Sequence, residues 1–206
     1  MFITLEGPDG SGKTSQLPAL EKFLQGAGYD VIVTREPGGT SVGDQIREIL
    51  MNLQNGSIIP RTEILLFLAA RAQHVDELVC PALAAGKIVL CDRYGDSTLA
   101  YQGFGHKTDL NTLKMLIDFS TGGLKPDLTL LLDVPVEMGI ARKLNNSTEW
   151  NRLDAYEQAF HERVRQGYFA LAEEEPWRWV IIDATEDMES VQKTLRKALL
   201  TRLEAG

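Results

Sequence analysis

The sequence predicts an α/β protein in which helices cover both faces of a five-stranded parallel sheet, giving a three-layer α/β/α sandwich with a short lid. Short apolar runs and longer segments with apolar residues at helical spacing alternate along the chain. Such alternation is typical of parallel strands joined by helical crossovers. The glycine-rich segment GPDGSGKT follows the first apolar run. It predicts a loop at the carboxyl end of a strand, where ligands bind in such sheets.

The first half of the chain contains two of the expected strands. Residues 2–5 (FITL) and 31–34 (VIVT) are apolar and rich in β-forming residues, as expected of strands buried on both faces. A helix follows the first strand and presents Leu17, Leu20 and Leu24 at helical spacing. Two helical stripes follow the second strand, namely Val42, Ile46, Ile49, Leu50 and Leu53, then Ile64, Leu65, Leu68, Ala72, Val75, Leu78 and Ala82.

The second half contains the other three strands, at residues 88–92 (IVLCD), 128–134 (LTLLLDV) and 179–183 (WVIID). Further helical stripes lie between and after them, formed by Leu110, Leu113, Leu116 and Ile117 and by Met188, Val191, Leu195 and Leu199. No internal repeat or linker interrupts the pattern, so we expect one domain over residues 1–206.

Length and composition limit the class of protein. A chain of 206 residues with 44% hydrophobic and 24% charged residues is typical of a globular domain. No apolar run approaches membrane-spanning length and no basic segment precedes the first strand, so we expect no membrane partner and a cytoplasmic location. The net charge of −8 argues against a nucleic-acid partner. Cys80 and Cys91 lack metal-ligand spacing, so reduced and buried thiols are expected.

Gly7, Gly12, Lys13 and Thr14 match the pattern of a P-loop, the phosphate-binding turn of P-loop NTPases. Glycines let backbone N–H groups converge on phosphate oxygens, and the next helix presents unpaired N–H donors and its positive dipole end. Lys13 would reach the β and γ phosphates, and the Thr14 hydroxyl suits Mg²⁺. The alternative is a glycine-rich turn without a ligand.

Charged residues also follow the third strand. Asp92 ends an apolar run, which is the pattern of a Walker B acid that helps to hold Mg²⁺. Arg93 follows it and offers a planar fork to a phosphate group. The alternatives are a turn cap for Asp92 and a surface ion pair for Arg93. A P-loop in the same sheet favours the functional interpretation.

Two other segments suggest a second ligand. Arg35 and Glu36 follow the second strand, and Pro37 biases Glu36 towards an extended conformation, which suggests a rigid polar wall. Phe67 and Arg71 share a helix face at i, i+4, so one side chain can stack on a nucleobase and the other can donate to its carbonyl group. The alternatives are an ordinary loop, a core phenylalanine and a structural salt bridge.

Residues 142–153 are polar and include RKLNNSTEWNR, which breaks the apolar rhythm before another helix. We interpret this segment as a basic lid. A solvated loop is the alternative, and composition alone does not separate the two.

In chain order, FITLEGPDGSGKT, TREPGGT, RTEILLFLAARAQH, CDRYGDSTLAYQG, PDLTLLLDV and NRLD resemble the thymidylate kinases of the bacterial type, a family of P-loop nucleoside monophosphate kinases. The likeness covers nearly the whole chain, and the TREPGG and DRYGDSTLAYQG blocks are more specific than the P-loop. The resemblance implies Mg²⁺-dependent transfer of the γ-phosphoryl group of ATP to dTMP, giving ADP and dTDP for dTTP synthesis.

The resemblance also implies site residues. The ATP site would comprise Gly7, Pro8, Asp9, Gly10, Ser11, Gly12, Lys13, Thr14, Arg142, Asp183 and Ala184. The dTMP site would comprise Asp9, Arg35, Glu36, Pro37, Arg47, Phe67, Arg71, Arg93, Thr98, Tyr101 and Gln102. The Mg²⁺ ion would be held near Thr14 and Asp92.

Within the dTMP site, the resemblance implies that Phe67 stacks on thymine and that Arg71 bonds its carbonyl edge. Arg93 and Arg35 would hold the phosphate, and Tyr101 would crowd the 2′ position and favour deoxyribose. The base would face Thr98 and Gln102, the sugar hydroxyl would face Asp9, and Arg47 would form a nearby wall.

The implied catalytic residues are Lys13, Arg93, Arg142, Arg152 and Asp9. The family that the sequence resembles has two classes, which differ in where the catalytic arginine lies. Because the P-loop interior, PDGS, contains no arginine, the resemblance implies that the positive charge at the transferred phosphoryl group comes from the lid. By position, Arg142 and Arg152 fill that role, and Arg142 would also lie against adenine.

Two other functions stay open at this point. A kinase of the same fold could act on another nucleotide or nucleoside. A side activity with dUMP also stays open, because uracil differs from thymine by one methyl group, worth only about 1 kcal/mol of selectivity. A P-loop switch or regulatory ATP-binding module would have no acceptor pocket, and a guanine switch would usually carry an NKxD motif, which this sequence lacks. The resemblance further implies a homodimer that forms through the long helix around residues 61–84.

Overall fold

Five parallel strands form the central sheet, in the order β2-β3-β1-β4-β5. This confirms the predicted three-layer α/β fold. The computed structural model describes residues 1–145 and 151–205. The strands are β1 (Phe2–Glu6), β2 (Val31–Arg35), β3 (Ile88–Asp92), β4 (Leu128–Asp133) and β5 (Trp179–Asp183). Each begins at the predicted residue, and no strand end differs from the prediction by more than one residue.

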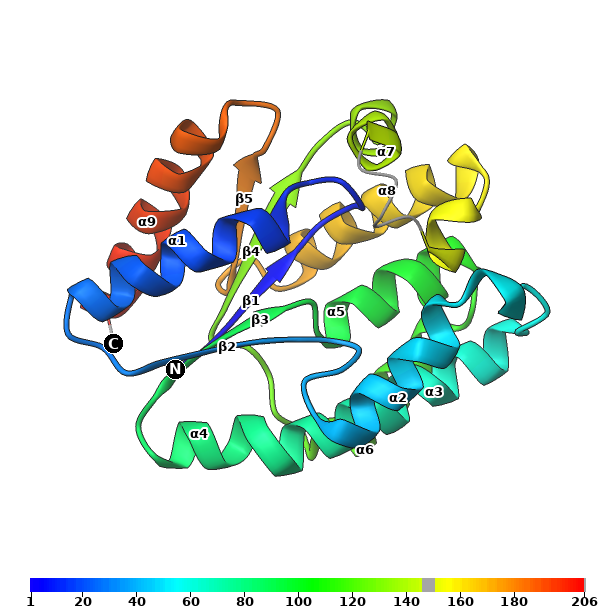
Figure 1. Cartoon of the computed structure of the whole chain (residues 1–206), viewed down its shortest axis with the longest axis horizontal. Helices are drawn as coiled ribbons and strands as arrows, with labels where there is room; N and C mark the ends of the chain where they lie inside the picture. The colour runs from blue at the N-terminus through cyan, green and yellow to red at the C-terminus, as the bar shows by residue number, and fades with distance from the viewer. Residues whose placement is uncertain (146–150, 206) are drawn as a thin grey trace.

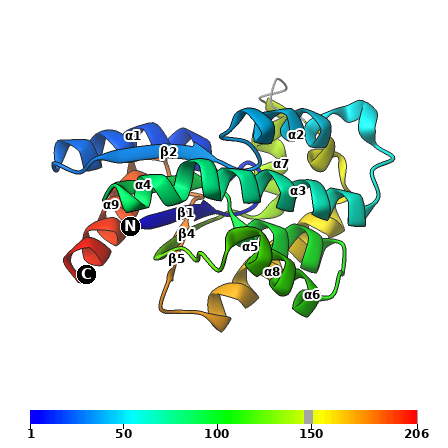
Figure 2. The ribbon, with the colours of Figure 1, turned by 90° about the horizontal axis from the view of Figure 1, so that it is seen from below.

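Helices fill the connections between strands (Figures 1 and 2). They are α1 (Lys13–Gly26), α2 (Ser41–Met51), α3 (Pro60–His74), α4 (Cys80–Ala84), α5 (Gly95–Thr98), α6 (Leu110–Thr121), α7 (Val136–Asn145), α8 (Gln158–Glu174) and α9 (Met188–Ala205). Two π-helical segments, η2 (Val75–Val79) and η3 (Leu99–Gly105), continue α3 and α5, and two short 3₁₀ turns are η1 (Leu53–Asn55) and η5 (Arg152–Ala155). Among the helices that the structure describes, none has the length and apolarity to cross a membrane.

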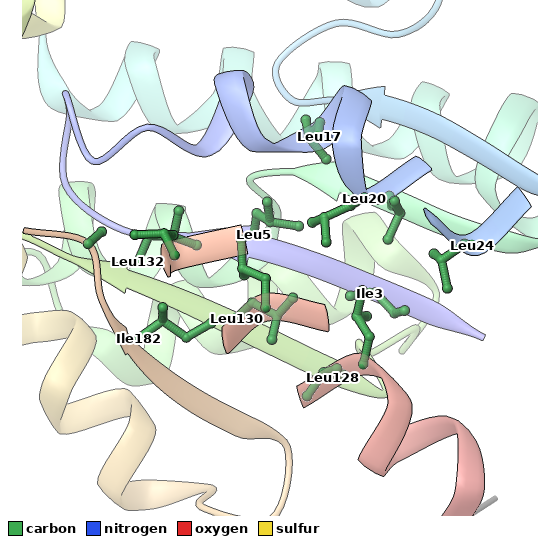
Figure 3. Packing of buried hydrophobic residues seen from close by; sticks show 14 of the residues in the cluster. Ile3, Leu5, Leu17, Leu20, Leu24, Leu128, Leu130, Leu132 and Ile182 are labelled. Atoms are coloured by element: carbon green, nitrogen blue, oxygen red, sulfur yellow. The ribbon is translucent and has the colours of Figure 1, made fainter. Parts of the chain in front are cut away.

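One face of the sheet is covered by α1 and α9. Ile3 and Leu5 of β1 point towards this face because side chains alternate along a strand. Figure 3 shows Leu17, Leu20 and Leu24 of α1 above them, and this cluster also includes Val191, Leu195 and Leu199 of α9. The apolar stripes predicted for these two helices are therefore the surfaces that cover the sheet, except that Met188 at the start of the α9 stripe is exposed.

The opposite face is covered by α3, α4, α6 and α8 together with η3. Phe2 and Val89 pack there against Val75 and Val79 of the α3–η2–α4 rod. Leu131 of β4 packs with residues of α8 and η3, among them Tyr168 and Tyr101. The helix predicted around residues 61–84 is thus one continuous helical rod with a π-helical segment in its middle.

Several predictions about burial are wrong. The stripe expected to run from Val42 to Leu53 breaks, because α2 ends at Met51 and only Leu50 of that stripe is fully buried. Val42, Ile49 and Leu53 are exposed. Cys80 is also exposed, whereas Cys91 is buried as expected, and both are free thiols. Helical spacing thus located the helix without identifying which of its faces meets the core.

The loops that follow β1, β2, β3 and β4 all lie at the carboxyl edge of the sheet, because the strands are parallel. Both chain termini lie near the other end of the sheet (Figures 1 and 2). Segments distant in sequence therefore meet at one edge, and that edge holds a large cavity.

Candidate active site

A cavity of about 1370 Å³ lies at the carboxyl edge of the sheet. A site for a single small ligand usually measures about 300–1,000 Å³, so this cavity has room for two. Of the residues predicted to be functional, its walls include Asp9, Gly10, Ser11, Gly12, Lys13, Thr14, Arg35, Glu36, Pro37, Arg47, Phe67, Asp92, Arg93, Thr98, Tyr101, Gln102, Arg142 and Ala184. The structure thus brings most of the predicted residues to one place.

The glycine-rich loop between β1 and α1 forms the floor of this cavity. The Lys13 ammonium donates to the carbonyl oxygens of Gly7 at 3.0 Å and Pro8 at 2.9 Å and to the Ser11 hydroxyl at 3.1 Å. Burial and the nearby positive charge of Arg93 lower the pKa of Lys13 to about 8. A bound phosphate group would add to the negative charge that Asp92, Asp9 and Glu6 already present to this buried cation.

The loop lies in direct backbone contact with α7. Gly10 has a φ of +76°, which favours glycine, and a Cβ atom there would come within 2.2 Å of the carbonyl oxygen of Gly139. A Cβ atom on Gly139 would in turn come within 2.3 Å of the carbonyl oxygen of Asp9. These two glycines fix α7, which carries Arg142, against the phosphate loop.

Thr14 and Asp92 form a pair of hard oxygen ligands beside the loop. The Thr14 hydroxyl donates to the Asp92 carboxylate at 2.6 Å. Within the part of the chain that the structure describes, no group of three or more histidine, cysteine, aspartate or glutamate side chains is placed to hold a metal. Mg²⁺ needs only one or two protein ligands, because it keeps waters and binds phosphate oxygens. The donor set therefore fits Mg²⁺ bound together with a nucleotide.

Arg93 lies between the phosphate loop and η3. Its guanidinium donates to the Asp9 carboxylate at 2.7 Å and to the Tyr101 hydroxyl at 3.1 Å, and Tyr101 donates to the other Asp9 oxygen at 2.5 Å. Although burial raises the pKa of Asp9, the charges of Arg93 and Lys13 lower it to about 2. The φ of Arg93 is +70°, uncommon for a residue with a side chain and typical of strain held at functional sites.

Glu6 supports Arg93 from below. The Glu6 carboxylate accepts from Ser97 at 2.6 Å and Tyr168 at 2.9 Å, and Arg93 donates to both hydroxyls, at 3.2 and 3.1 Å. Burial and the charge of Asp96 raise the pKa of Glu6 to about 7, against the opposing effect of Arg93. This network fixes the position of the Arg93 guanidinium before any ligand binds.

A second buried network lies behind the wall made by β2 and α3. Arg71 donates to Glu36 at 2.7 Å, to the Thr98 hydroxyl at 3.0 Å and to the backbone carbonyl of Tyr94 at 2.9 Å. His74 bonds the other Glu36 oxygen at 2.9 Å. Arg71 is almost fully buried and is not among the residues that line the cavity.

Arg35, Arg47 and Phe67 line the cavity beside this network. Arg47 donates to the Pro37 carbonyl at 3.0 Å, and burial together with the charges of Arg35 and Arg93 lowers its pKa. Mutual repulsion of this kind favours binding of an anion. Phe67 is half-buried and so presents part of its ring to the cavity.

At the other end of the cavity, Arg142 of α7 donates to the Ala184 carbonyl at 3.0 Å. Ala184 lines the cavity, but Asp183 does not. The Asp183 carboxylate instead accepts from the backbone N–H of Thr185 at 2.9 Å and from its hydroxyl at 2.7 Å, and so shapes the turn. Asp183 therefore acts on this wall through the backbone.

Arg152 lies elsewhere. Its guanidinium donates to the Leu50 carbonyl at 2.8 Å, to the Tyr156 hydroxyl at 3.0 Å and to the Glu63 carboxylate. The residue is buried and does not line the cavity. The sequence placed Arg152 at the transferred phosphoryl group, whereas its side chain is here part of a buried ion pair. The rest of the predicted lid that follows α7, residues 146–150, lies outside the described residues.

With this geometry in view, comparisons with known proteins identify the family. The profile of the thymidylate kinase family matches residues 5–195. The chain belongs to the thymidylate kinase family. A thymidylate kinase from Geotalea uraniireducens is 49% identical over 210 residues, which cover 100% of this chain and 99% of the relative. Another from Thermomicrobium roseum is 54% identical over 190 residues, which cover 92% of this chain and 90% of the relative.

A solved structure agrees with this assignment. The crystal structure of thymidylate kinase from Ehrlichia chaffeensis matches with a TM-score of 0.79 and 34% sequence identity, covering 97% of this chain and 98% of that one. The family resemblance of the sequence motifs is therefore confirmed, and so is the fold that it implied.

Sequence reasoning assigned no site role of their own to several residues that surround this cavity. Lys143 lines the cavity and forms an ion pair with Asp154 at 3.1 Å. Its place next to Arg142 in a basic segment was an available signal. Nothing in the sequence indicated that Tyr168 and Glu63 support the site, because their hydrogen-bond partners are far away in sequence.

Proposed function

We propose that this chain transfers the γ-phosphoryl group of ATP to dTMP, giving ADP and dTDP for dTTP synthesis. One observation carries the proposal: a single cavity is equipped differently at its two ends. The P-loop with Lys13 and Thr14 lines one part of it, and Phe67 and Gln102 line another, while Arg93 lies beside the loop and bonds its residue Asp9. A hydrolase or switch that binds ATP alone would have no use for the second set.

In the ATP half, the loop N–H groups, Lys13 and the start of α1 would bind the phosphates. The adenine would pass the backbone at Ala184, beside Arg142. Thr14 and Asp92 would hold the Mg²⁺ ion, which when bound would neutralise negative charge on the phosphates.

In the dTMP half, Arg93 with Arg35 and Arg47 would bind the acceptor phosphate. Phe67 would stack on thymine while Tyr101 crowds the 2′ position. Arg71 would act at the base edge from behind Thr98 and Glu36, and Asp9 would face the sugar hydroxyl. Because Asp9, Arg93 and Tyr101 are already hydrogen-bonded together, little reorganisation is needed when dTMP binds.

In the transfer, an oxygen of the acceptor phosphate attacks the γ-phosphorus of ATP. The bond between the γ-phosphorus and the β,γ-bridging oxygen breaks, and its electron pair stays on ADP. Positioning and charge neutralisation supply most of the rate in such reactions. Lys13 and Arg93 stand at the two sides of the transfer path. We assign Arg142 to the charge on the transferred group, and we assign a positioning role to the buried Arg152. Residues 142–153 would act as the lid that excludes water.

We also propose that the whole chain works as one domain in the cytoplasm and forms a homodimer. Leu65 on α3 and Met115 and Phe119 on α6 are exposed apolar side chains, and α3 packs against α6. A dimer contact through α3 would cover such residues. Light scattering of the wild type and of Leu65→Glu tests this: the wild type should have the dimer mass, and a monomer mass for the wild type would contradict it.

The proposed activity is tested by coupled ADP release with ATP and Mg²⁺, first without an acceptor and then with dTMP, dUMP, dCMP or dGMP. ADP release that depends on dTMP, with weaker release for dUMP, is the expected result. Equal ADP release with and without each acceptor would support the interpretation as an ATP-binding module and would exclude a kinase activity. Comparable release with another monophosphate would point to a kinase of different specificity.

A further inference from the structure

Glu63 of α3 is a fully buried carboxylate that the proposed chemistry does not use. One of its oxygens, Oε1, accepts from the Gln102 side-chain amide at 2.7 Å and bonds the Nε2 atom of His106 at 3.2 Å. The other, Oε2, accepts from Arg152 and from the Tyr156 hydroxyl at 3.1 Å. The carboxylate therefore joins the wall that contains Gln102 to the turn η5 that contains Arg152.

Glu63 stays ionised in this environment. Although burial raises the pKa of Glu63, hydrogen bonds from His106, Gln102 and Arg152 and the charge of Arg152 lower it to about 2. An ionised carboxylate only accepts hydrogen bonds. Gln102 must therefore turn its NH₂ group towards Glu63, and this assigns the orientation of its side-chain amide.

The same constraint turns the Gln102 carbonyl oxygen away from Glu63. Gln102 lines the cavity, and across residues 1–145 and 151–205 no donor reaches its Oε1 atom. In those same residues, only the His161 Nε2 and Trp179 Nε1 atoms are both buried and without a hydrogen-bond partner. The Gln102 oxygen is thus not sealed inside the protein, and it is available to the cavity as an acceptor.

We propose that Glu63 sets the base specificity of the acceptor site by holding Gln102 as a hydrogen-bond acceptor towards the base. The inference rests on the proposed function, because it concerns the nucleotide that accepts the phosphoryl group. Thymine and uracil carry an N3–H donor, which a fixed carbonyl oxygen pairs with. Cytosine carries a lone pair on N3, which the same oxygen repels. Leaving a polar group unpaired in a buried site is the strongest means of rejecting an analogue.

Glu63→Gln removes the constraint with a minimal change of shape. A carboxamide at position 63 can donate as well as accept, so Gln102 can rotate and present its NH₂ group to the base. We expect the ratio of kcat/KM for dTMP to that for dCMP to fall by at least about tenfold. A purely structural role of Glu63 would lower both values alike and leave the ratio unchanged.

Two further variants sharpen the test. Tyr156→Phe removes one donor from the other oxygen of Glu63 and does not touch Gln102, so the ratio should stay within about twofold of the wild type. In Glu63→Gln combined with Gln102→Glu, the new amide donates to one oxygen of the new carboxylate. The second oxygen then faces the base as an acceptor, so the preference for dTMP should return.

The wild-type protein provides a measurement that needs no variant. By NMR, the side-chain NH₂ protons of Gln102 should exchange slowly with solvent, because they are held by a buried carboxylate. Rapid exchange of both protons would overturn the inference even if Glu63→Gln failed to fold. An unchanged ratio in a folded Glu63→Gln enzyme would also overturn it while leaving the kinase intact, whereas a wild type without dTMP-dependent ADP release would refute the proposed function itself.

Discussion

Replacing Arg152 with methionine separates a role in the fold from a role at the transferred phosphoryl group. Methionine keeps much of the side-chain length and removes the charge. In the structure, this change leaves Glu63 buried without its cationic partner and leaves the Leu50 carbonyl without a donor. We therefore expect Arg152→Met to lower stability strongly and to affect turnover weakly.

The magnitude follows from the burial of the pair. Removing one partner of a buried ion pair costs about 3–5 kcal/mol. The pKa of Glu63 is lowered from 4.5 to about 2 by all its partners together, which corresponds to about 3 kcal/mol. We take about 3 kcal/mol as the expected loss. For a domain of this size, that loss lowers Tm by about 6–12 °C.

The sign of the pH dependence also follows. The folded-state pKa of Glu63 lies below its unfolded value, so the stabilisation is complete above pH 4.5 and is lost as the pH falls towards 2. The Tm difference between wild type and Arg152→Met should therefore be largest near neutral pH and narrow below about pH 4.5.

Thermal unfolding followed by circular dichroism, together with kcat at 25 °C from the coupled assay, measures both effects. Arg163→Met is the matched control, because Arg163 is partly exposed: it donates to the Gly105 carbonyl, lies 3.9 Å from the exposed Glu157 carboxylate and lies over the Phe160 ring. It should lose no more than about 1 kcal/mol. A Tm for Arg152→Met within about 2 °C of the wild type, with kcat reduced about 10³-fold, would refute the positioning role and return Arg152 to the transfer step.

Three further outcomes are expected. Arg142→Ala should lower kcat about 10³-fold with little change in Tm, because this residue makes one bond to a backbone carbonyl; a change in the KM for ATP alone would contradict its assignment. Thr14→Ala should raise the Mg²⁺ concentration for half-maximal rate about tenfold in a metal titration, and an unchanged titration curve would place the metal elsewhere. Leu20→Ala should lower the free energy of unfolding by about 2–5 kcal/mol, because Leu20 is fully buried, whereas Leu200→Ala at an exposed site should change it by less than about 0.5 kcal/mol; equal losses in denaturant unfolding would show that the core assignment is wrong.

The strands were predictable almost to the residue, because each is a continuous apolar run. The strands β1 and β3 are buried throughout as expected, whereas the edge strand β5 exposes Ile181. Helices were located well, but their orientation was not. Ile49 of α2 and Leu53 of η1 fit the predicted helical stripe and are nevertheless exposed, because apolar side chains also occur on surfaces. Periodicity reports spacing and does not identify the neighbour that each face meets.

The site shows the same limit. Lys13, Thr14 and Asp92 were predictable because each lies in a short contiguous motif at the end of a strand. Arg152 appeared equivalent to Arg142 because both are basic residues of one polar segment. Their positions differ because Glu63, 89 residues away, pairs with Arg152 inside the protein. The sequence alone does not contain that pairing.

The contact between Gly10 and Gly139 has a consequence for genetics. At most packed positions, a larger residue on one side is compensated by a smaller residue on the other. Both partners here are already glycine, so neither has a side chain left to shorten. No substitution at position 10 can therefore suppress the effect of Gly139→Ala, and no substitution at position 139 can suppress the effect of Gly10→Ala. In a selection from a library randomised at both codons, the survivors should keep glycine at both positions together.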